Sequence, residues 1–175
     1  TFRELGKLYD SEASYRKAIK LNPKYSEAYN NLGIVLRELN KLDESESSLK
    51  KAIKLKPNYA DAYNNLSFTL LQKYNFKEAF ESYEWRWETE GENKKKLISA
   101  KPIWKGEKNS KIYIWREQGI GDEIMFCSVL PEIKNLAKKL IVNCDRRLVP
   151  LFKRSLPQNY VYKTNREEIE DEEYD

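Results

Sequence analysis

One segment of this sequence occurs twice with little change, as Tyr25-Ser-Glu-Ala-Tyr-Asn-Asn-Leu-Gly33 and as Tyr59-Ala-Asp-Ala-Tyr-Asn-Asn-Leu-Ser67. The two copies lie 34 residues apart. The same offset relates four further pairs of identical residues: Ala18 and Ala52, Ile19 and Ile53, Leu21 and Leu55, and Pro23 and Pro57. A fixed period of this length, with small and aromatic residues at set positions, predicts stacked helix–turn–helix units.

Each unit has the apolar spacing of two helices that pack face to face. The first helix carries a stripe with spacings of three and four residues, formed by Tyr29, Leu32, Leu36 and Leu39. The second helix carries the facing stripe, formed by Leu42, Leu49, Ala52 and Ile53. Pro57 ends this second helix, because proline disfavours helical geometry in the residue before it. Neither helix can bury its stripe alone, so the pairs must stack.

The pattern of residues 26–59 resembles the tetratricopeptide repeat. The family's signature positions hold Tyr29, Leu32, Gly33, Leu36, Ala52 and Pro57. Ser45 stands where the family usually has Ala, and the next unit begins at Ala60. The resemblance implies an α-solenoid over residues 1–90, with two and a half repeats and a final aromatic helix that ends in Glu84-Trp85-Arg86-Trp87. The half repeat leaves the N-terminal end open, so we expect preceding residues, or self-association with another subunit, to cover it.

Four asparagines lie at matching positions of the predicted first helices: Asn30 and Asn31, and then Asn64 and Asn65. Stacked pairs form a concave surface. In the solenoid of the O-GlcNAc transferases, which these repeats resemble, asparagines grip peptide backbone, because an amide offers both a donor and an acceptor. The resemblance implies a protein or peptide partner on the concave face. It does not support the family's carboxylate clamp, which uses Lys and Arg at comparable positions. The alternative is that the asparagines stabilise packing between repeats.

After a linker predicted over residues 91–110, strands and helices alternate. The predicted strands are Lys111–Trp115, Leu140–Asn143 and Asn159–Lys163, and the predicted helices are Glu123–Leu140 and Arg146–Leu156. Strand–helix–strand order with short links implies parallel strands joined by right-handed crossovers. Residues 111–175 are therefore expected to form a small three-stranded α/β unit that is Rossmann-like, half of a doubly wound fold.

A glycine turn, Gln118-Gly-Ile-Gly-Asp122, follows the first of these strands. A Gly-x-Gly turn after a strand is part of the dinucleotide fingerprint, but the third glycine is absent. Asp122 and Glu123 stand at the helix start, where carboxylates repel a pyrophosphate and suit the positive end of the helix dipole. The turn therefore predicts no bound cofactor, and Asp122 is a candidate N-cap.

The segment Trp115-Arg-Glu-Gln-Gly-Ile-Gly-Asp-Glu-Ile-Met-Phe126 resembles the opening of a glycosyltransferase-like domain that bacterial proteins fuse to tetratricopeptide repeats. Tyr83-Glu-Trp-Arg-Trp87 and Trp104-Lys-Gly106 fit the same fusion. The domain is similar to the acceptor-side half of heptosyltransferases and other GT-B transferases. The resemblance implies that Asp122 is the base that activates the acceptor hydroxyl. The acceptor-cleft loop would also contain Gln118, Gly119, Gly121 and Glu123.

Composition excludes several other classes of site. The sequence has no His and two Cys, Cys127 and Cys144, which removes Ser-His-Asp and Cys-His catalysis and every common zinc site. The net charge is +4, and residues 91–165 carry 16 basic and 7 acidic side chains. These basic residues are not interleaved with aromatic ones, so nucleic acid is the least favoured partner. No apolar run is long enough to span a bilayer, which predicts a soluble cytoplasmic protein.

Three functions remain open on the sequence. The first is a peptide-binding module attached to a truncated glycosyltransferase-like domain that is not catalytic by itself. The second is the N-terminal, acceptor-binding part of a nucleotide-sugar-dependent glycosyltransferase, whose donor half would lie beyond Asp175. The third is a basic nucleic-acid binder, for which no motif is present.

Overall fold

The computed structural model describes residues 2–89, 99–117, 119–156 and 160–164, with side chains from Leu5 onward. Part of the linker predicted over residues 91–110 lies outside these ranges. The chain divides into two compact units, Thr1–Lys94 and Lys95–Asp175, and each has its own hydrophobic cluster. Within the described ranges, no helix combines the length and the apolar character needed to cross a lipid bilayer.

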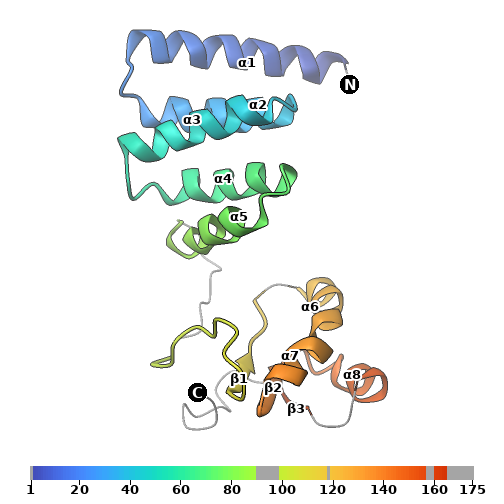
Figure 1. The fold of residues 1–175 in the computed structure, drawn as a ribbon. Coiled ribbons are helices and arrows are strands. Elements are labelled where there is room, and N and C mark those ends of the chain that lie inside the picture. The colour runs from blue at the N-terminus through green and yellow to red at the C-terminus, as the bar shows by residue number, and fades with distance from the viewer. Residues whose placement is uncertain (1, 90–98, 118, 157–159, 165–175) are drawn as a thin grey trace. The chain divides into compact units, whose positions relative to one another are not determined.

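The first unit consists of helices that follow one another as hairpins (Figure 1). Its elements are α1 (Phe2–Leu21), α2 (Ser26–Glu38), α3 (Leu42–Leu55), α4 (Ala60–Gln72), α5 (Phe76–Tyr83) and the 3-10 helix η1 (Glu84–Glu88). α2 pairs with α3 and α4 with α5, while α1 packs on α2 and α3 packs on α4. The predicted stack of helix pairs is confirmed, with α1 in the place of the second helix of a pair.

The turns inside the two complete pairs repeat with the period of the sequence. Asn40 and Tyr74, which lie one repeat apart, both adopt a positive φ, of 58° and 60°. The turn-closing hydrogen bonds repeat as well, from the Lys41 N–H to the Leu36 carbonyl at 2.8 Å and from the Asn75 N–H to the Leu70 carbonyl at 3.0 Å. Asn adopts this left-handed conformation readily, whereas a bulky Tyr does so at a cost. The turn at Tyr74 therefore has the same backbone conformation as the turn at Asn40, but it is strained.

The core of the solenoid depends on close contact between α2 and α3. Leu36 and Leu49 have no exposed surface, and a Cβ atom built on Gly33 would lie 2.5 Å from Leu49 Cγ. Only glycine fits there. Ser45, also fully buried, donates to the Gly33 carbonyl at 2.7 Å and lies 3.0 Å from the Thr69 hydroxyl. This hydroxyl pair joins α2, α3 and α4 at the position where the tetratricopeptide pattern usually has Ala.

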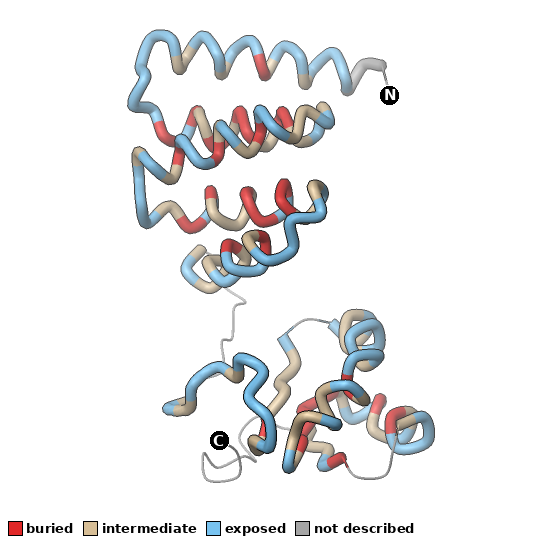
Figure 2. The backbone as a smooth tube through the Cα atoms, in the orientation of Figure 1, coloured by how far each residue is buried: buried red, intermediate tan, exposed pale blue. Residues whose placement is uncertain are grey.

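The two ends of the solenoid differ in how they are covered. At the C-terminal end, the Trp85 ring stacks on Tyr63, with 4.1 Å between the ring centroids and an interplanar angle of 6°. At the other end, α1 has one buried position among its described side chains, Glu12 (Figure 2). Three fully buried residues of α3, Ser45, Leu49 and Ala52, have the half-buried counterparts Ser11, Tyr15 and Ala18 in α1. The apolar face of α1 is thus left partly open.

The second helices of the repeats are linked by ion pairs that also follow the period. Arg16 bridges Glu12 and Glu44, and one repeat later Lys50 bridges Glu46 and Glu78. Hydrogen bonds from Lys41, and then from Arg16, hold the pKa of Glu12 below its usual value. Hydrogen bonds from Lys50 and Lys73 do the same for the pKa of Glu46. These charges therefore satisfy one another along one side of the solenoid.

The second unit contains a three-stranded parallel sheet. Strands β1 (Lys111–Ile114), β2 (Lys139–Asn143) and β3 (Val161–Lys163) lie in the order β1-β2-β3, with Ile112 opposite Leu140 and Val142 opposite Tyr162. The connections contain α6 (Ile120–Phe126), the 3-10 helix η2 (Cys127–Val129), α7 (Leu130–Leu136) and α8 (Val149–Ser155). The predicted number of strands and their parallel direction are confirmed for the described residues.

The prediction of one helix over Glu123–Leu140 is wrong. The chain instead forms α6, η2 and α7 in succession, because Pro131 cannot donate the backbone hydrogen bond of a helix interior and lies in the first turn of α7. The last of these helices ends at Leu136, and the Lys138 N–H then donates to the Ser110 carbonyl. The helix predicted over Arg146–Leu156 begins later, at Val149, because Pro150 fits only its first turn.

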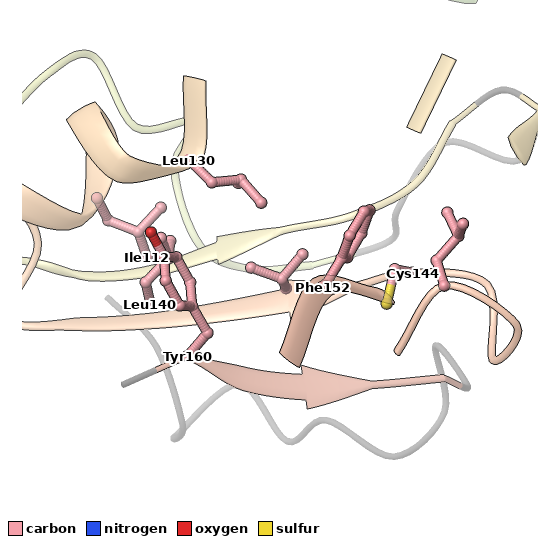
Figure 3. Packing of buried hydrophobic residues seen from close by; sticks show 8 residues of the cluster. Ile112, Leu130, Leu140, Cys144, Phe152 and Tyr160 are labelled. Atoms are coloured by element: carbon pink, nitrogen blue, oxygen red, sulfur yellow. The ribbon is translucent and has the colours of Figure 1, made fainter. Parts of the chain in front are cut away.

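The core of the second unit lies on one face of the sheet (Figure 3). It combines side chains from the strands with side chains from the helices and loops: Ile112, Leu130, Leu140, Val142, Cys144, Leu148, Phe152 and Tyr160. Burial raises the pKa of Cys144 to about 11. The neutral thiol therefore serves as a small apolar core group at neutral pH.

Candidate functional site

Three of the four predicted asparagines form a hydrogen-bonded chain between α2 and α4, which we call the amide chain. Asn65 Nδ2 donates to Asn30 Oδ1 at 3.0 Å, and Asn30 Nδ2 donates to Asn31 Oδ1 at 3.2 Å. Asn30 is buried, while Asn31 and Asn65 are half-buried. Asn30 therefore joins the two repeats, as the packing alternative predicts. Asn31 Nδ2 and Asn65 Oδ1, at the two ends, have no hydrogen-bond partner within the described residues.

Asn64, the fourth predicted asparagine, lies outside this chain. Its Oδ1 has no accessible surface and no hydrogen-bond partner in the described part of the chain. A buried acceptor without a donor costs about 1–3 kcal/mol. Asn64 is thus an unsatisfied amide beside the amide chain, next to Asn65 in the sequence.

A row of cationic and aromatic side chains continues across the same helices. The Arg37 guanidinium lies 5.5 Å from the centre of the Phe68 ring, and Phe68 meets the Tyr83 ring edge-on at 6.1 Å. The Arg86 guanidinium lies 4.3 Å from the ring centre of Tyr83 and 4.4 Å from that of Trp87. This arginine–aromatic row connects α2, α4, α5 and η1.

The amide chain and the start of this row share one surface. Phe68 follows Asn65 by three positions on α4, and Arg37 follows Asn30 by seven on α2, so helical spacing places each pair on one side of its helix. We call this surface the α2–α4 face, made of Asn30, Asn31, Arg37, Asn64, Asn65 and Phe68. The Phe68 side chain is 40% exposed there. The face therefore combines amide hydrogen-bonding groups, one aromatic ring and one cation.

Sequence reasoning found the asparagines of this face and missed Arg37 and Phe68. One signal for Phe68 was present, since the residue at the same position of the previous repeat is Ile34. The same comparison gives a signal for Arg37, because its counterpart in the next repeat is the apolar Leu71. The pairing of Asn65 with Asn30, and not with its own counterpart Asn31, depends on how the helices are rotated against each other.

In the glycine turn of the second unit, Asp122 is not the N-cap that the sequence predicts. Gly119 is the N-cap of α6, and Asp122 lies at the third helical position, where its Oδ2 accepts the Gly119 N–H at 3.2 Å. The helix starts earlier than predicted, at Ile120. Gly119 has an extended backbone and is the N-cap, so the first helical residue is Ile120. Gly121 is exposed within α6, and Gln118 lies outside the described residues.

Glu123 links the ends of two strands in this unit. Its side chain is 8% exposed, and its carboxylate accepts the backbone N–H of Asp145 at 2.8 Å, just after β2. Arg116, just after β1, lies 3.9 Å from Glu123 and 3.3 Å from Asp145. The Arg147 side chain holds the pKa of Asp145 far below its usual range. These charges fix the loops after β1 and β2. Among the described residues, no group of His, Cys, Asp or Glu is arranged to hold a metal ion.

The first unit matches a known family. Models described as tetratricopeptide repeat match residues 1–25 and 14–47, and a model described as TPR repeat matches residues 33–73. Together these ranges span α1 to α4 of the structure. Residues 1–73, which form most of the first unit, are therefore tetratricopeptide repeats.

Several known proteins are similar to part of the chain. Protein FlbA of Caulobacter vibrioides is 33% identical over 86 residues, which are 46% of this chain and 14% of FlbA. The crystal structure of MamA has a TM-score of 0.44 at 26% identity and covers 47% of this chain and 48% of MamA. YrrB, described as "a TPR protein with an unusual peptide-binding site", has a TM-score of 0.44 at 27% identity, and the match covers 47% of this chain and 42% of YrrB. The chain thus spans less than half the length of each of these proteins.

Proposed function

We propose that the tetratricopeptide unit binds an extended segment of a protein or peptide on the α2–α4 face. The observation that supports this most directly is the amide chain, whose two ends offer a donor, Asn31 Nδ2, and an acceptor, Asn65 Oδ1. An extended peptide exposes alternating N–H and C=O groups, so it can bond to both ends. The packing role of Asn30 supports the proposal further, because it holds the outer amides in fixed positions.

The size of the face limits how much the amides contribute. Each neutral hydrogen bond nets about 0.5–1.5 kcal/mol, so two of them give only a fraction of the about 8 kcal/mol of micromolar binding. Contact with the exposed Phe68 ring must supply a large part of the rest, since a buried aromatic dominates interface energetics. The proposed ligand is therefore a segment that carries an apolar side chain beside its backbone contacts.

A displayed library of random peptides, selected on the full chain, tests this function. Asn31→Ala and Asn65→Ala should each weaken the selected peptides by about threefold to tenfold, in proportion to one lost hydrogen bond. The matched control is Asn58→Ala, which removes an exposed asparagine from the turn between α3 and α4. Fluorescence polarisation measures the affinities, and circular dichroism confirms that each variant is folded. If no peptide is selected, or if both variants bind as the wild type does, the proposal is wrong.

A second proposed function concerns the α/β unit. We infer that it is a Rossmann-like, acceptor-side part of a nucleotide-sugar-dependent glycosyltransferase, with Asp122 as the base that activates the acceptor hydroxyl. Two features support this: the strands are parallel, and Asp122 follows the carboxyl end of β1, where open α/β sheets bind their ligands. A carboxylate base contributes roughly 10²–10⁴ in rate, and only opposite a bound donor sugar. The 175-residue chain is therefore expected to have no transferase activity of its own.

Transfer assays with the chain alone and with a longer polypeptide that includes a donor-binding half test this second function. The chain alone should turn over no nucleotide sugar, and Asp122→Asn should remove activity from the longer polypeptide. Glu132→Gln on α7, an exposed carboxylate, is the matched control and should leave activity unchanged. Full activity of the Asp122→Asn enzyme would contradict the role proposed for Asp122.

We further propose that the protein works in the bacterial cytoplasm and self-associates through the open face of α1. Support comes from the partial exposure of Ser11, Tyr15 and Ala18, whose counterparts in α3 are fully buried. Sedimentation velocity over a hundredfold range of concentration tests the self-association. The wild type should form dimers, Tyr15→Glu should stay monomeric, and a wild-type monomer at the highest concentration would exclude self-association.

A further inference from the structure

We propose that Arg37 anchors a carboxylate of the bound segment, so that the partner of the α2–α4 face is an acidic peptide. This inference rests on the proposed peptide binding and adds the chemical class of the ligand. It concerns a residue that the asparagine pattern did not include. The absence of a carboxylate clamp at Asn30, Asn31, Asn64 and Asn65 is compatible with it, because Arg37 lies further along α2, in its last turn.

The first observation is that Arg37 lacks the carboxylate partner that several other cations of the solenoid have. Arg16 pairs with two glutamates, and Arg86 pairs with Glu84 at 3.0 Å. Lys50 also pairs with two glutamates. Arg37 has no carboxylate within ion-pair distance among the described residues, although the side chain is half-buried. Arg37 is therefore a cation that the solenoid places on the α2–α4 face without neutralising it.

The second observation concerns the hydrogen bonds of the guanidinium group. Nη1 of Arg37 has no accessible surface and no hydrogen-bond partner in the described part of the chain. Buried donors are almost always satisfied, and a charged donor costs more than a neutral one when it is not. A carboxylate from a ligand would supply the missing acceptor after a turn of the terminal torsions of the side chain.

The third observation is that Phe68 supports the guanidinium on one side. With 5.5 Å between the guanidinium carbon and the ring centre, the ring contacts the cation without taking up any of its N–H groups as hydrogen-bond donors. A planar guanidinium presents two parallel N–H groups, which match the two oxygens of a carboxylate. Lysine cannot make this bidentate contact, so the site should distinguish Arg from Lys at position 37.

The geometry also predicts where the acidic residue lies in the ligand. Phe68 is adjacent to Arg37 and also lies one turn after Asn64 and Asn65 on α4. A segment that bonds its backbone to the amide chain would therefore place one side chain on Phe68 and a neighbouring carboxylate on Arg37. We expect selected peptides to share an Asp or Glu next to an apolar residue.

Sequencing the displayed peptides selected on the full chain gives the first test. Enrichment of Asp or Glu at one position beside an apolar residue is expected, and the Arg37→Gln chain should lose this enrichment. If peptides are selected but show no acidic preference, the inference about Arg37 is wrong while peptide binding stands. If no peptide is selected at all, the proposed function fails and the inference fails with it.

A mutant cycle with one selected peptide gives the second test. Changing its shared Glu to Gln should weaken binding to the wild type by about tenfold or more, the lower range for a hydrogen bond to a charged group. The same peptide change should alter binding to Arg37→Gln by less than twofold, because the two changes remove the same contact. For Arg37→Lys, the effect of the peptide change on affinity should lie between its effects for the wild type and for Arg37→Gln. Equal effects of the peptide change on wild type and Arg37→Gln would overturn the inference.

Two controls separate a specific contact from a general charge effect. Lys51→Gln removes one positive charge from an exposed position of α3 in the same unit and should change affinity by less than twofold. Arg37→Glu should lose the acidic peptide and bind a version in which Lys replaces its Glu. If Lys51→Gln weakens binding as much as Arg37→Gln does, the effect is long-range attraction and the assigned contact is wrong.

Discussion

Asn40 and Tyr74 occupy the same place in two successive turns of the solenoid and share a positive φ. The ion pairs of Arg16 and Lys50 repeat with the same offset. The core of the α/β unit has no such internal counterparts, since Ile112 and Leu140 come from two strands of different length and Phe152 comes from a helix. In the solenoid, each residue can therefore be compared with the residue at the same position of another repeat. The α/β unit allows no such comparison.

Two residues that differ from their counterparts in the other repeat identify the α2–α4 face, whose composition the packing of the helices does not explain. Phe68 stands where the previous repeat has Ile34, and Arg37 has the apolar counterpart Leu71. Both departures lie on the α2–α4 face beside the amide chain. Mutations at such positions, and matched mutations in the α/β unit, can therefore test this difference between a unit whose positions repeat and one whose positions do not.

The largest effect is expected from core truncation in each unit. Leu49→Ala in the solenoid and Leu140→Ala in the sheet both remove fully buried leucines and should each cost about 2–5 kcal/mol of unfolding free energy. Hydrogen exchange, followed by mass spectrometry, should show faster exchange through α2, α3 and α4 for Leu49→Ala. For Leu140→Ala the faster exchange should lie in β1, β2 and β3. A change of less than about 1 kcal/mol in either variant would contradict the packing described here.

The next effect compares two helical glycines, one in each unit. Gly33→Ala should destabilise the solenoid by about 1–3 kcal/mol, because its Cβ would meet Leu49 Cγ at 2.5 Å. Gly121→Ala in α6 meets no heavy atom within 4 Å and should stabilise the sheet unit by about 0.5–1 kcal/mol through helix propensity. Urea denaturation measures both, and the same sign for the two variants would contradict this prediction.

A smaller effect is expected from exchanging the counterparts in the two turns. Tyr74→Asn should raise the unfolding free energy by about 1 kcal/mol, because Asn tolerates the φ of 60° that strains Tyr. Asn40→Tyr should lower it by a similar amount. Thermal unfolding under identical conditions checks both changes. A neutral result for Tyr74→Asn would show that the edge contact between Tyr74 and Phe76 offsets the strain.

The smallest effect is the pH dependence of the ion pairs between second helices. The pKa values of Glu12 and Glu46 are lowered in the folded state, so their stabilisation is complete above the unfolded pKa of about 4.5. It is lost as the pH falls through the lowered folded values. The wild type should therefore lose stability from about pH 5 downward, and Glu46→Gln should lose less. At pH 7, Glu46→Gln should cost about 0.2–1 kcal/mol.

Urea midpoints measured from pH 7 to pH 3 check this dependence. Glu38→Gln, at an exposed position of α2, is the matched control and should follow the wild-type profile. Parallel profiles for the wild type and Glu46→Gln would show that these pairs do not contribute.

The sequence was sufficient for the features that repeat and for those set by local chemistry. The repeat period predicted the helix pairs, and the β-branched runs predicted three parallel strands. The continuous helix over Glu123–Leu140 was wrong because apolar spacing was given more weight than Pro131. The N-cap assigned to Asp122 was wrong because helix α6 starts at Ile120, after an extended Gly119.

The candidate site was predictable only in part. The asparagines were visible as identical residues at matching positions, but which amides bond to each other depends on the rotation of α2 against α4. The contact of Arg37 with Phe68 joins two residues of successive repeats that do not share a repeat position. Contacts of this kind arise from tertiary packing, and no local pattern in the sequence specifies them.

The central claim is that binding belongs to the solenoid and uses the α2–α4 face. Nuclear magnetic resonance of the ¹⁵N-labelled full chain, titrated with the strongest peptide from the displayed library, tests it most directly. We predict that the side-chain amide resonances of Asn31 and Asn65 shift together with backbone resonances of α2 and α4, while those of residues 111–164 stay in place. Shifts confined to residues 111–164 would contradict the claim.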